Sequence, residues 1–360
     1  MDGGGAPHWD RFAHWPRGAA RAVLATVVAI LLLAIWTTLP TGREDAVPSQ
    51  GETAAAPVRD ADLQLYDRIA ERVAAGEDYY RAAIEEQRSA NFPVRPGVAV
   101  RLPTMAFLAA LMGREALGAL LLLGAVAAAA WFVRLGEEPG GRERRVTATA
   151  LLLAGMAAGL NPAYLVLHEV WAGLLVALAI GVHRPGRWHW AWLAAAAALA
   201  IREHALPFVL LLGATAVWRR DWREAAAWAV LVALFALGLW LHLGQVNALL
   251  RPSDRPSDSW LALRGLRGLV GNLVATSPLQ FLPPWLAAPL ALLPLLGWAG
   301  WKSPLGAFAT LLCAGYGLLF MIAGRDNNFY WALLVTPVWF VGLAFVPMAL
   351  RSLWRSATAG

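Results

Sequence analysis

Residues 188–218, WHWAWLAAAAALAIREHALPFVLLLGATAVW, decide the fold, because three consecutive ionisable residues, Arg202-Glu203-His204, interrupt an otherwise apolar run. About 20 apolar residues in a helix cross the ~30 Å hydrocarbon core of a membrane. Both ends of the run are basic, so we expect the chain to cross, turn at Arg202 and return. Pro207 lies just after the break and suits a turn or an interrupted helix. The alternative is one long kinked helix, which would reverse the side of every later loop.

The rest of the chain reads in the same way. Residues 146–182 are expected to reverse near Asn161-Pro162, and 59% of the sequence is hydrophobic. We predict an all-α fold, a single integral membrane domain over residues 1–360 with about ten transmembrane helices. The first is interpreted as an uncleaved span, since no clean small-x-small cleavage site follows it. The predicted spans are 21–39, 115–133, 146–160, 163–182, 188–201, 205–218, 224–246, 284–300, 304–323 and 330–350.

Basic residues in the connections predict the orientation. Arg-rich connections at 134–145, 183–187 and 219–223, with Lys302 and Arg351, all fall on one side when the N-terminus is inside. The positive-inside bias makes that side cytoplasmic. We therefore expect a protein of the bacterial inner membrane with both termini cytoplasmic. The net charge of +6 comes without any DNA- or RNA-binding motif, so nucleic acid is not an expected partner.

Two long outer loops follow from this topology, residues 40–104 and 247–283. In the first, a polar start at 40–57 is followed by apolar residues at helical spacing, which predict an amphipathic helix from Asp60 to Ala75 that stops at Gly76. Residues 76–80 and 91–96 are expected to form a structured loop, and 104–112 a short apolar segment. In the second, apolar residues from Trp260 to Val270 alternate with Arg264 and Arg267, as in a helix lying on the bilayer.

The strongly polar clusters near the apolar spans all fall on the outer side of this topology. Ionisable groups near hydrocarbon are costly and usually functional, so we expect a site open to the outside. The candidate site residues are Asp60, Asp62, Tyr79, Tyr80, Arg101, His168, Glu169, Arg202, Glu203, Arg325, Asn328 and Tyr330.

Each candidate has a structural alternative. Asp60 and Asp62 stand at a helix start, where Asp caps free N–H groups; either could instead be a general base, and the pair could hold a divalent cation. Arg101 could be an interfacial residue or a bidentate partner of phosphate. For Arg202, at a helix break between apolar halves, phosphate binding is the better account. His168-Glu169 could join helices or take part in the site. Residues 325–330 are expected to form a short turn, and this turn explains the presence of Asn327 better than that of Arg325.

The sequence lacks the motifs of several classes of enzyme. G-x-S-x-G, H-E-x-x-H, Walker A and dinucleotide-binding fingerprints do not occur, and His168-Glu169 lacks the second His of a zincin. The single cysteine, Cys313, lies in an apolar run, which excludes an intrachain disulfide and a Cys-based metal site. We expect no soluble cofactor.

Taken together, these residues resemble the GT-C superfamily of membrane glycosyltransferases, which take sugars from polyprenyl-phosphate donors. The stretch Asp62-Leu-Gln-Leu-Tyr66, then Gly76-Glu-Asp-Tyr-Tyr80 and Arg101-Leu-Pro103 are similar to its first-loop pattern. The stretches His168-Glu-Val-Trp-Ala-Gly173, Arg202-Glu203 and Gly324-Arg-Asp-Asn-Asn-Phe-Tyr-Trp331 resemble a bacterial subgroup linked to cell-surface glycopolymer formation. The resemblance covers about residues 60–350.

The resemblance implies an inverting transferase that moves a sugar from a polyprenyl phosphate to a glycan or lipid acceptor on the outer face, within membrane lipid. Asp62 would be the general base, with Asp60 assisting or binding a cation. The donor phosphate would be held by Arg101, Arg202 and Arg325, while His168, Glu169, Tyr79 and Tyr80 would position the sugar or acceptor. The alternatives are a transporter or flippase for lipid-linked sugars, and a non-catalytic subunit of glycopolymer export.

Overall fold

Helices account for 78% of this computed structural model, and the residues it describes, 9–38 and 60–359, form no β-strand. The all-α prediction is confirmed. By length and composition, five described helical stretches are able to cross a membrane: Arg17–Thr38, Gly97–Gly136, Trp222–Leu249, Pro304–Ile322 and Thr336–Thr358. These helices give the chain the character of a membrane protein. The expected polar start of the first outer loop lies outside the described residues.

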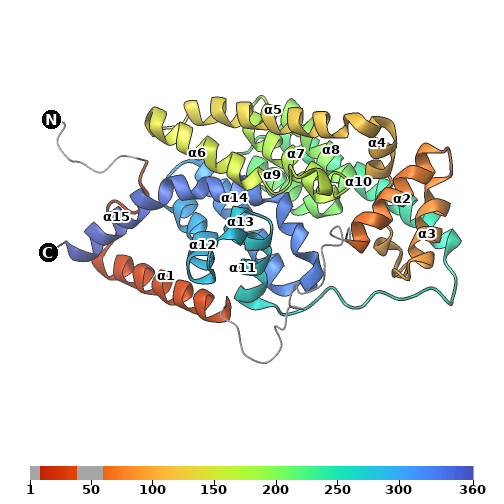
Figure 1. Cartoon of the computed structure of the whole chain (residues 1–360). Coiled ribbons are helices and arrows are strands. Elements are labelled where there is room, and N and C mark those ends of the chain that lie inside the picture. Colours follow the sequence, from red (N-terminus) through yellow and green to blue (C-terminus); the bar gives the residue numbers. More distant parts are fainter. Residues whose placement is uncertain (1–8, 39–59, 360) are drawn as a thin grey trace.

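The α-helices follow the predicted spans closely along most of the chain (Figure 1). They are α1 (Arg17–Thr38), α2 (Ala61–Ala74), α3 (Tyr79–Ser89), α4 (Thr104–Met112), α5 (Ala116–Gly136), α6 (Gly141–Met156), α7 (His168–Val182), α8 (His189–Ile201), α9 (Leu206–Trp218), α10 (Trp222–Leu249), α11 (Gly265–Ala275), α12 (Pro284–Gly300), α13 (Pro304–Ile322), α14 (Thr336–Val341) and α15 (Val346–Thr358). Five helices that correspond to predicted spans, α6, α7, α8, α9 and α12, have only 13 to 17 residues. A 13-residue helix is about 20 Å long, less than the hydrocarbon thickness, so the number of spans stays a prediction.

Both expected interruptions are present. Between α6 and α7 the chain forms the short 3₁₀ helix η3 (Pro162–Tyr164), where the Asn161 side chain accepts a hydrogen bond from the Ala163 N–H at 2.9 Å. Between α8 and α9, Arg202 adopts an extended conformation (φ −144°, ψ 116°), and η4 (Glu203–Ala205) follows. Residues 188–218 therefore do not form one continuous helix, and the reversal of the chain at Arg202 stays a prediction.

The C-terminal segment differs from the prediction. In place of one helix over 330–350, the chain forms the 3₁₀ helix η6 (Asp326–Leu334), then α14, the 3₁₀ turn η7 (Gly342–Phe345) and α15. Pro337 and Pro347 lie in the first turns of α14 and α15. Proline has no backbone N–H to donate, so it is favoured in the first turn of a helix, where that N–H would have no partner within the helix.

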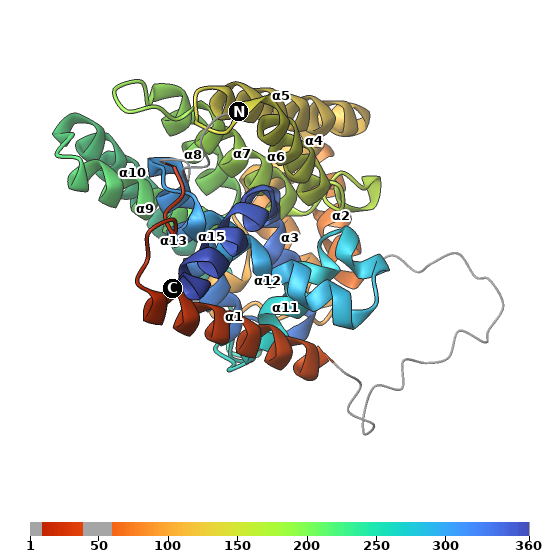
Figure 2. The same ribbon diagram turned by 90° about the vertical axis from the view of Figure 1, so that its left-hand side faces the viewer.

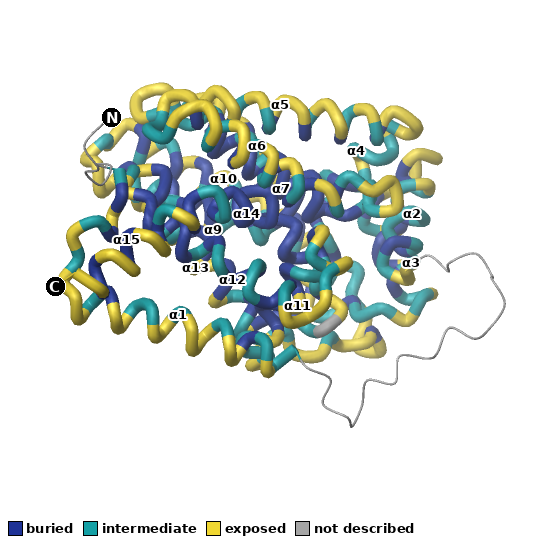
Figure 3. The backbone as a smooth tube through the Cα atoms, turned by 60° about the vertical axis from the view of Figure 1, so that its left-hand side comes forward, coloured by how far each residue is buried: buried dark blue, intermediate teal, exposed yellow. Residues whose placement is uncertain are grey.

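The middle of this interrupted segment, around α14, lies at the centre of the bundle. Figure 3 shows α7 and α14 buried, with exposed residues along α1 and α5. Glycines let three helices approach its backbone closely. A Cβ atom on Gly155 of α6, Gly173 of α7 or Gly297 of α12 would overlap the carbonyl oxygen of Thr336, Leu333 or Gly342 respectively. Small residues at such contacts are how helices pack closely in a membrane, where burial away from water drives association little.

Helices α2 and α3 and one long extended segment complete the fold. The predicted amphipathic helix is α2, capped by Asp60 and followed by Gly76 at φ 88°. Residues 79–89, for which the sequence indicated only part of a structured loop, form α3, capped by Asp78. The extended segment, residues 254–261, is called the strap. It runs between α10 and α11 (Figure 1). The buried face of α11 packs against α13 and η6.

The packing of the core leads to a test with two helical glycines. Gly173→Ala should lower the free energy of unfolding by about 1–3 kcal/mol, because the added methyl group overlaps fixed backbone. Gly118→Ala on exposed α5, where a Cβ meets nothing within 4 Å, should be neutral or gain up to about 1 kcal/mol. Thermal unfolding in one detergent measures both, and equal midpoints would contradict the close packing.

Candidate functional site

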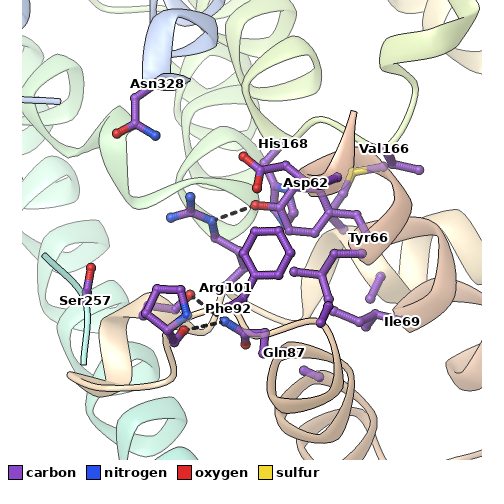
Figure 4. Close-up of a pocket in the computed structure, with 18 of the residues that line it drawn as sticks. Asp62, Tyr66, Ile69, Gln87, Phe92, Arg101, Val166, His168, Ser257 and Asn328 are labelled. Atoms are coloured by element: carbon purple, nitrogen blue, oxygen red, sulfur yellow. Dashed lines mark hydrogen bonds between the residues drawn. The ribbon is translucent and has the colours of Figure 1, made fainter. Parts of the chain in front are cut away.

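A pocket of about 380 Å³ lies where α2, α3, the start of α4, the strap and η6 meet, next to the start of α7. Its size is within the usual range for small-molecule sites. Figure 4 shows Asp62, Tyr66 and His168 gathered on one part of the wall, and Ser257 and Asn328 across the cavity from Ile69. Segments far apart in sequence therefore converge here, as the common sidedness of the polar clusters suggested.

Asp62 is the half-buried carboxylate of this pocket. It lies in the first turn of α2, where the backbone N–H of Asp62 donates a hydrogen bond to the Oδ1 atom of Asp60 at 2.9 Å. The Asp62 Oδ2 atom accepts a hydrogen bond from the hydroxyl of Tyr330 at 3.2 Å. Burial raises the pKa of Asp62 above its usual range, and the negative charge of Asp60 raises it further. Asp60 is exposed and serves as the helix cap.

Arg101 supplies a guanidinium to the same pocket. Its Nε donates to the hydroxyl of Tyr66 at 3.2 Å, and its Nη1 lies 3.7 Å from Oε1 of Glu203. The Arg101 carbonyl accepts a hydrogen bond from the Tyr79 hydroxyl at 2.6 Å, which ties α3 to the start of α4. The Tyr66 ring in turn packs edge-on against His168, with ring centroids 5.0 Å apart.

Behind the pocket, Arg202 lies inside the bundle. None of its side chain is exposed, its Nε lies 2.6 Å from Glu169, and its Nη1 donates to Glu203 at 2.5 Å. Arg202, Glu169 and Glu203 do not line the pocket. A buried charge needs partners of opposite sign, and here two carboxylates face one guanidinium. The structure therefore places Arg202 where it neutralises Glu169 and Glu203, in contrast to the phosphate contact expected for it.

The remaining candidates come from η6 and from its N-cap, Arg325. Arg325 donates from Nη2 to the Ser257 hydroxyl at 2.6 Å and to the Asp258 carbonyl at 2.9 Å. Asn328 accepts from the Arg325 backbone N–H at 3.0 Å and donates to the Tyr330 hydroxyl at 3.2 Å. These bonds align Tyr330 toward Asp62. Arg325, Asn328 and Tyr330 all line the pocket.

Tyr79 and Tyr80 face different cavities. Tyr79 lines the pocket, while Tyr80 lines a largely apolar groove of about 440 Å³ between α8 and α10. In Figure 2, α10 lies at the edge of the bundle. The buried His242 also lines this groove; its ring lies 5.6 Å from Tyr80, and its Nε2 is 3.1 Å from the Val100 carbonyl oxygen. Leu102, next to Arg101, lines both the pocket and the groove.

Sequence reasoning missed several residues of the pocket wall. Tyr66 lies four residues after Asp62, a helical spacing that puts both on one face of α2 and could have identified it. The strap contributes Arg255, Ser257, Asp258 and Trp260, and no local pattern marks an extended segment as a pocket wall. Within the described residues, no three His, Cys, Asp or Glu side chains are grouped to hold a metal ion. The expected cation site thus stays a prediction.

The buried charges lead to a stability test. Glu169→Gln leaves Arg202 with one carboxylate in place of two, and should cost part of the about 3–5 kcal/mol that leaving a buried charge without any partner typically costs. We expect a clear fall in the thermal unfolding midpoint of the purified protein. Glu85→Gln, an exposed glutamate paired with Arg72, should change the midpoint little. If both variants unfold at one temperature, the Arg202 network is not holding the bundle.

The chain was compared with protein-family models, with curated proteins and with solved structures, and no match was found in any of the three. The residues of the pocket, their contacts and their charges are thus the basis on which a function can be proposed.

Proposed function

We propose that this chain is an inverting membrane glycosyltransferase of the GT-C type. It would move a sugar from a polyprenyl-phosphate donor to a cell-envelope glycan or lipid acceptor on the outer face of the bacterial inner membrane. The observation that carries the proposal is the half-buried Asp62 with a raised pKa, in one pocket with Arg101 and with the tyrosine hydroxyl of Tyr330. A carboxylate tuned toward neutral pH beside a cation suits proton abstraction next to a departing phosphate.

The chemistry follows from these groups. An acceptor hydroxyl oxygen attacks C1 of the donor sugar, and its proton passes to the Asp62 carboxylate. The new C1–O bond to the acceptor forms as the C1–O bond to phosphate breaks, and the bonding electron pair leaves with the polyprenyl phosphate. Arg101 stabilises the charge that develops on this leaving group. A single displacement of this kind inverts the configuration at C1.

The other candidates take roles that fit their positions. Arg325, on the pocket wall, is the second cation available to the donor phosphate. Arg202 acts indirectly, because its bond to Glu203 holds the carboxylate that faces Arg101. His168 and Tyr66 form the wall beside Asp62 and are suited to contact the sugar.

The groove between α8 and α10 supports a lipid-linked substrate. Its lining is mostly apolar, and it meets the pocket at Leu102, so a polyprenyl chain lying there would end beside Arg101. The same groove favours the second candidate, a transporter or flippase for lipid-linked sugars. That protein would need a polar pathway across the membrane, whereas the candidate groups here gather at one end of the bundle.

The outward orientation of the pocket is part of the proposal. In Figure 1, α2 and α3 lie at one end of the bundle, while the start of α1 and the end of α15 lie at the other. Ten helical crossings with both termini inside would put that first end outside. Helices α8 and α9 are shorter than the hydrocarbon core, so the non-helical residues at their ends would have to span the remaining thickness.

Replacement of Asp62 tests the chemistry. Asp62→Asn preserves shape but cannot accept a proton, so transfer of labelled sugar from a polyprenyl phosphate in nanodiscs should fall about 10²–10⁴-fold. Because its pKa is raised, the parent should lose kcat/KM on acidification at a pH above the usual 3.8 of Asp. Asp60→Asn is the matched control and should be milder. Failure of both, mimicked by EDTA, would indicate a cation instead.

Wild-type transfer by Asp62→Asn would overturn the proposal. If neither the parent nor the variant transfers sugar, but labelled lipid-linked sugar crosses proteoliposome membranes, the transporter is correct.

Topology is tested with single cysteines in a Cys313→Ser background. Ser89→Cys and Ser253→Cys, both at exposed outer positions, should react with a membrane-impermeant thiol reagent in intact spheroplasts. Arg142→Cys and Arg187→Cys, exposed in the proposed inner connections, should react only after lysis. Labelling of Arg187→Cys in intact cells would invert the middle of the topology and contradict an outward pocket.

A further inference from the structure

The strap forms a wall of the pocket that does not extend to the groove between α8 and α10. Arg255, Pro256, Ser257, Asp258 and Trp260 all line the pocket, and none of them lines the groove. Gln87, Asn91 and Phe92, from the end of α3 and the turn after it, line the same pocket beside the strap. The Arg255 guanidinium of the strap donates to the Asn91 carbonyl at 2.7 Å, which holds the two segments together. We call the part of the pocket that these two neighbouring segments line the outer compartment.

The strap is held at both ends. At its start, Asp254 accepts two hydrogen bonds from the Arg88 guanidinium, at 2.7 and 2.9 Å, and this pairing lowers the pKa of Asp254 to about 2. The Ser257 N–H donates to the Arg95 carbonyl at 2.6 Å. At its end, the Trp260 carbonyl accepts from the Gly324 N–H at 2.8 Å. A segment fixed in this way presents a preorganised surface, and an ordered surface costs less entropy to bind.

The chemistry of the outer compartment differs from that of the space around Asp62. It combines an amide at Asn91, the exposed opposite charges of Arg255 and Asp258, and the rings of Phe92 and Trp260. A sugar ring has a C–H face that packs on aromatic surface and an edge of hydroxyl groups that both donate and accept hydrogen bonds. Amides and carboxylates meet such hydroxyl groups, and Tyr and Trp rings supply apolar area at low entropic cost.

We propose that the outer compartment binds a sugar residue of the acceptor, so that the acceptor is a neutral glycan and not a sugar-free lipid. This inference rests on the proposed function, in which the donor occupies the side of Arg101 and the groove. The acceptor then enters from the opposite side, across Asp62. Arg325 bonds to the strap at Ser257 and Asp258, so it joins the acceptor wall to the phosphate side of the pocket.

The test measures binding alone and needs neither donor nor turnover. Protein in nanodiscs is applied to a printed array of neutral glucan, galactan, mannan, arabinan and N-acetylhexosamine oligomers, with polyprenol and diacylglycerol as sugar-free spots. We expect retention on at least one oligosaccharide. The double variant Asn91→Gly with Asp258→Ala should weaken it at least tenfold. Asn91 has φ 56°, which glycine adopts readily, and Asp258 is exposed, so the fold should persist.

Two further variants complete the design. Trp260→Leu removes the ring and should weaken the same binding independently, while Ser253→Ala, exposed in the same loop but outside the pocket wall, should not. Retention only on sugar-free lipid, no retention anywhere, or equal binding by the double variant would overturn the inference. Glycan binding without any sugar transfer would instead overturn the proposed transferase and leave the glycan site standing.

Discussion

The neutralisation of one buried guanidinium is the constraint on which the site depends. Arg202 has no exposed surface, and water cannot stabilise its charge, so Glu169 at the start of α7 and Glu203 after the break must stay beside it. Glu203 also faces Arg101, at 3.7 Å. The position of the pocket cation is therefore set from inside the bundle. The break between α8 and α9 places Arg202 where both carboxylates reach it.

Much of the fold was predictable because helix ends carry local signals. Asp60 and Gly76 marked the ends of α2 within a residue or two, and the charges around Arg202 marked a break. The path of residues 326–345 was not predictable. Their apolar composition suits a continuous span, and their interruptions depend on two prolines and on glycines in helices far away in sequence. α3 was missed because its buried residues, such as Ala82 and Ala83, are small and leave a weak apolar pattern.

For the site, the sequence indicated at which level of the bundle the polar side chains lie, but not which way each side chain points. The sequence predicted one common site, and Asp62, Arg101, His168, Asn328 and Tyr330 line one pocket in the structure. It could not distinguish a side chain on the pocket wall from one behind it, because that depends on how each helix is rotated about its axis. Arg202 and Glu169 lie at the right level and point into the bundle. Tyr79 and Tyr80 are adjacent in sequence, but their side chains line two different cavities.

The glycine contacts around α14 have a consequence for biosynthesis. Gly155, Gly173 and Gly297 are translated well before the backbone that fills the space beside them, at residues 333–342. Until that late segment emerges from the ribosome, α6, α7 and α12 have no partner for these surfaces, and the Tyr330 that faces Asp62 is absent too. The earlier helices can enter the membrane one by one, but the bundle and its pocket are completed together, only after residues 333–342 have been made.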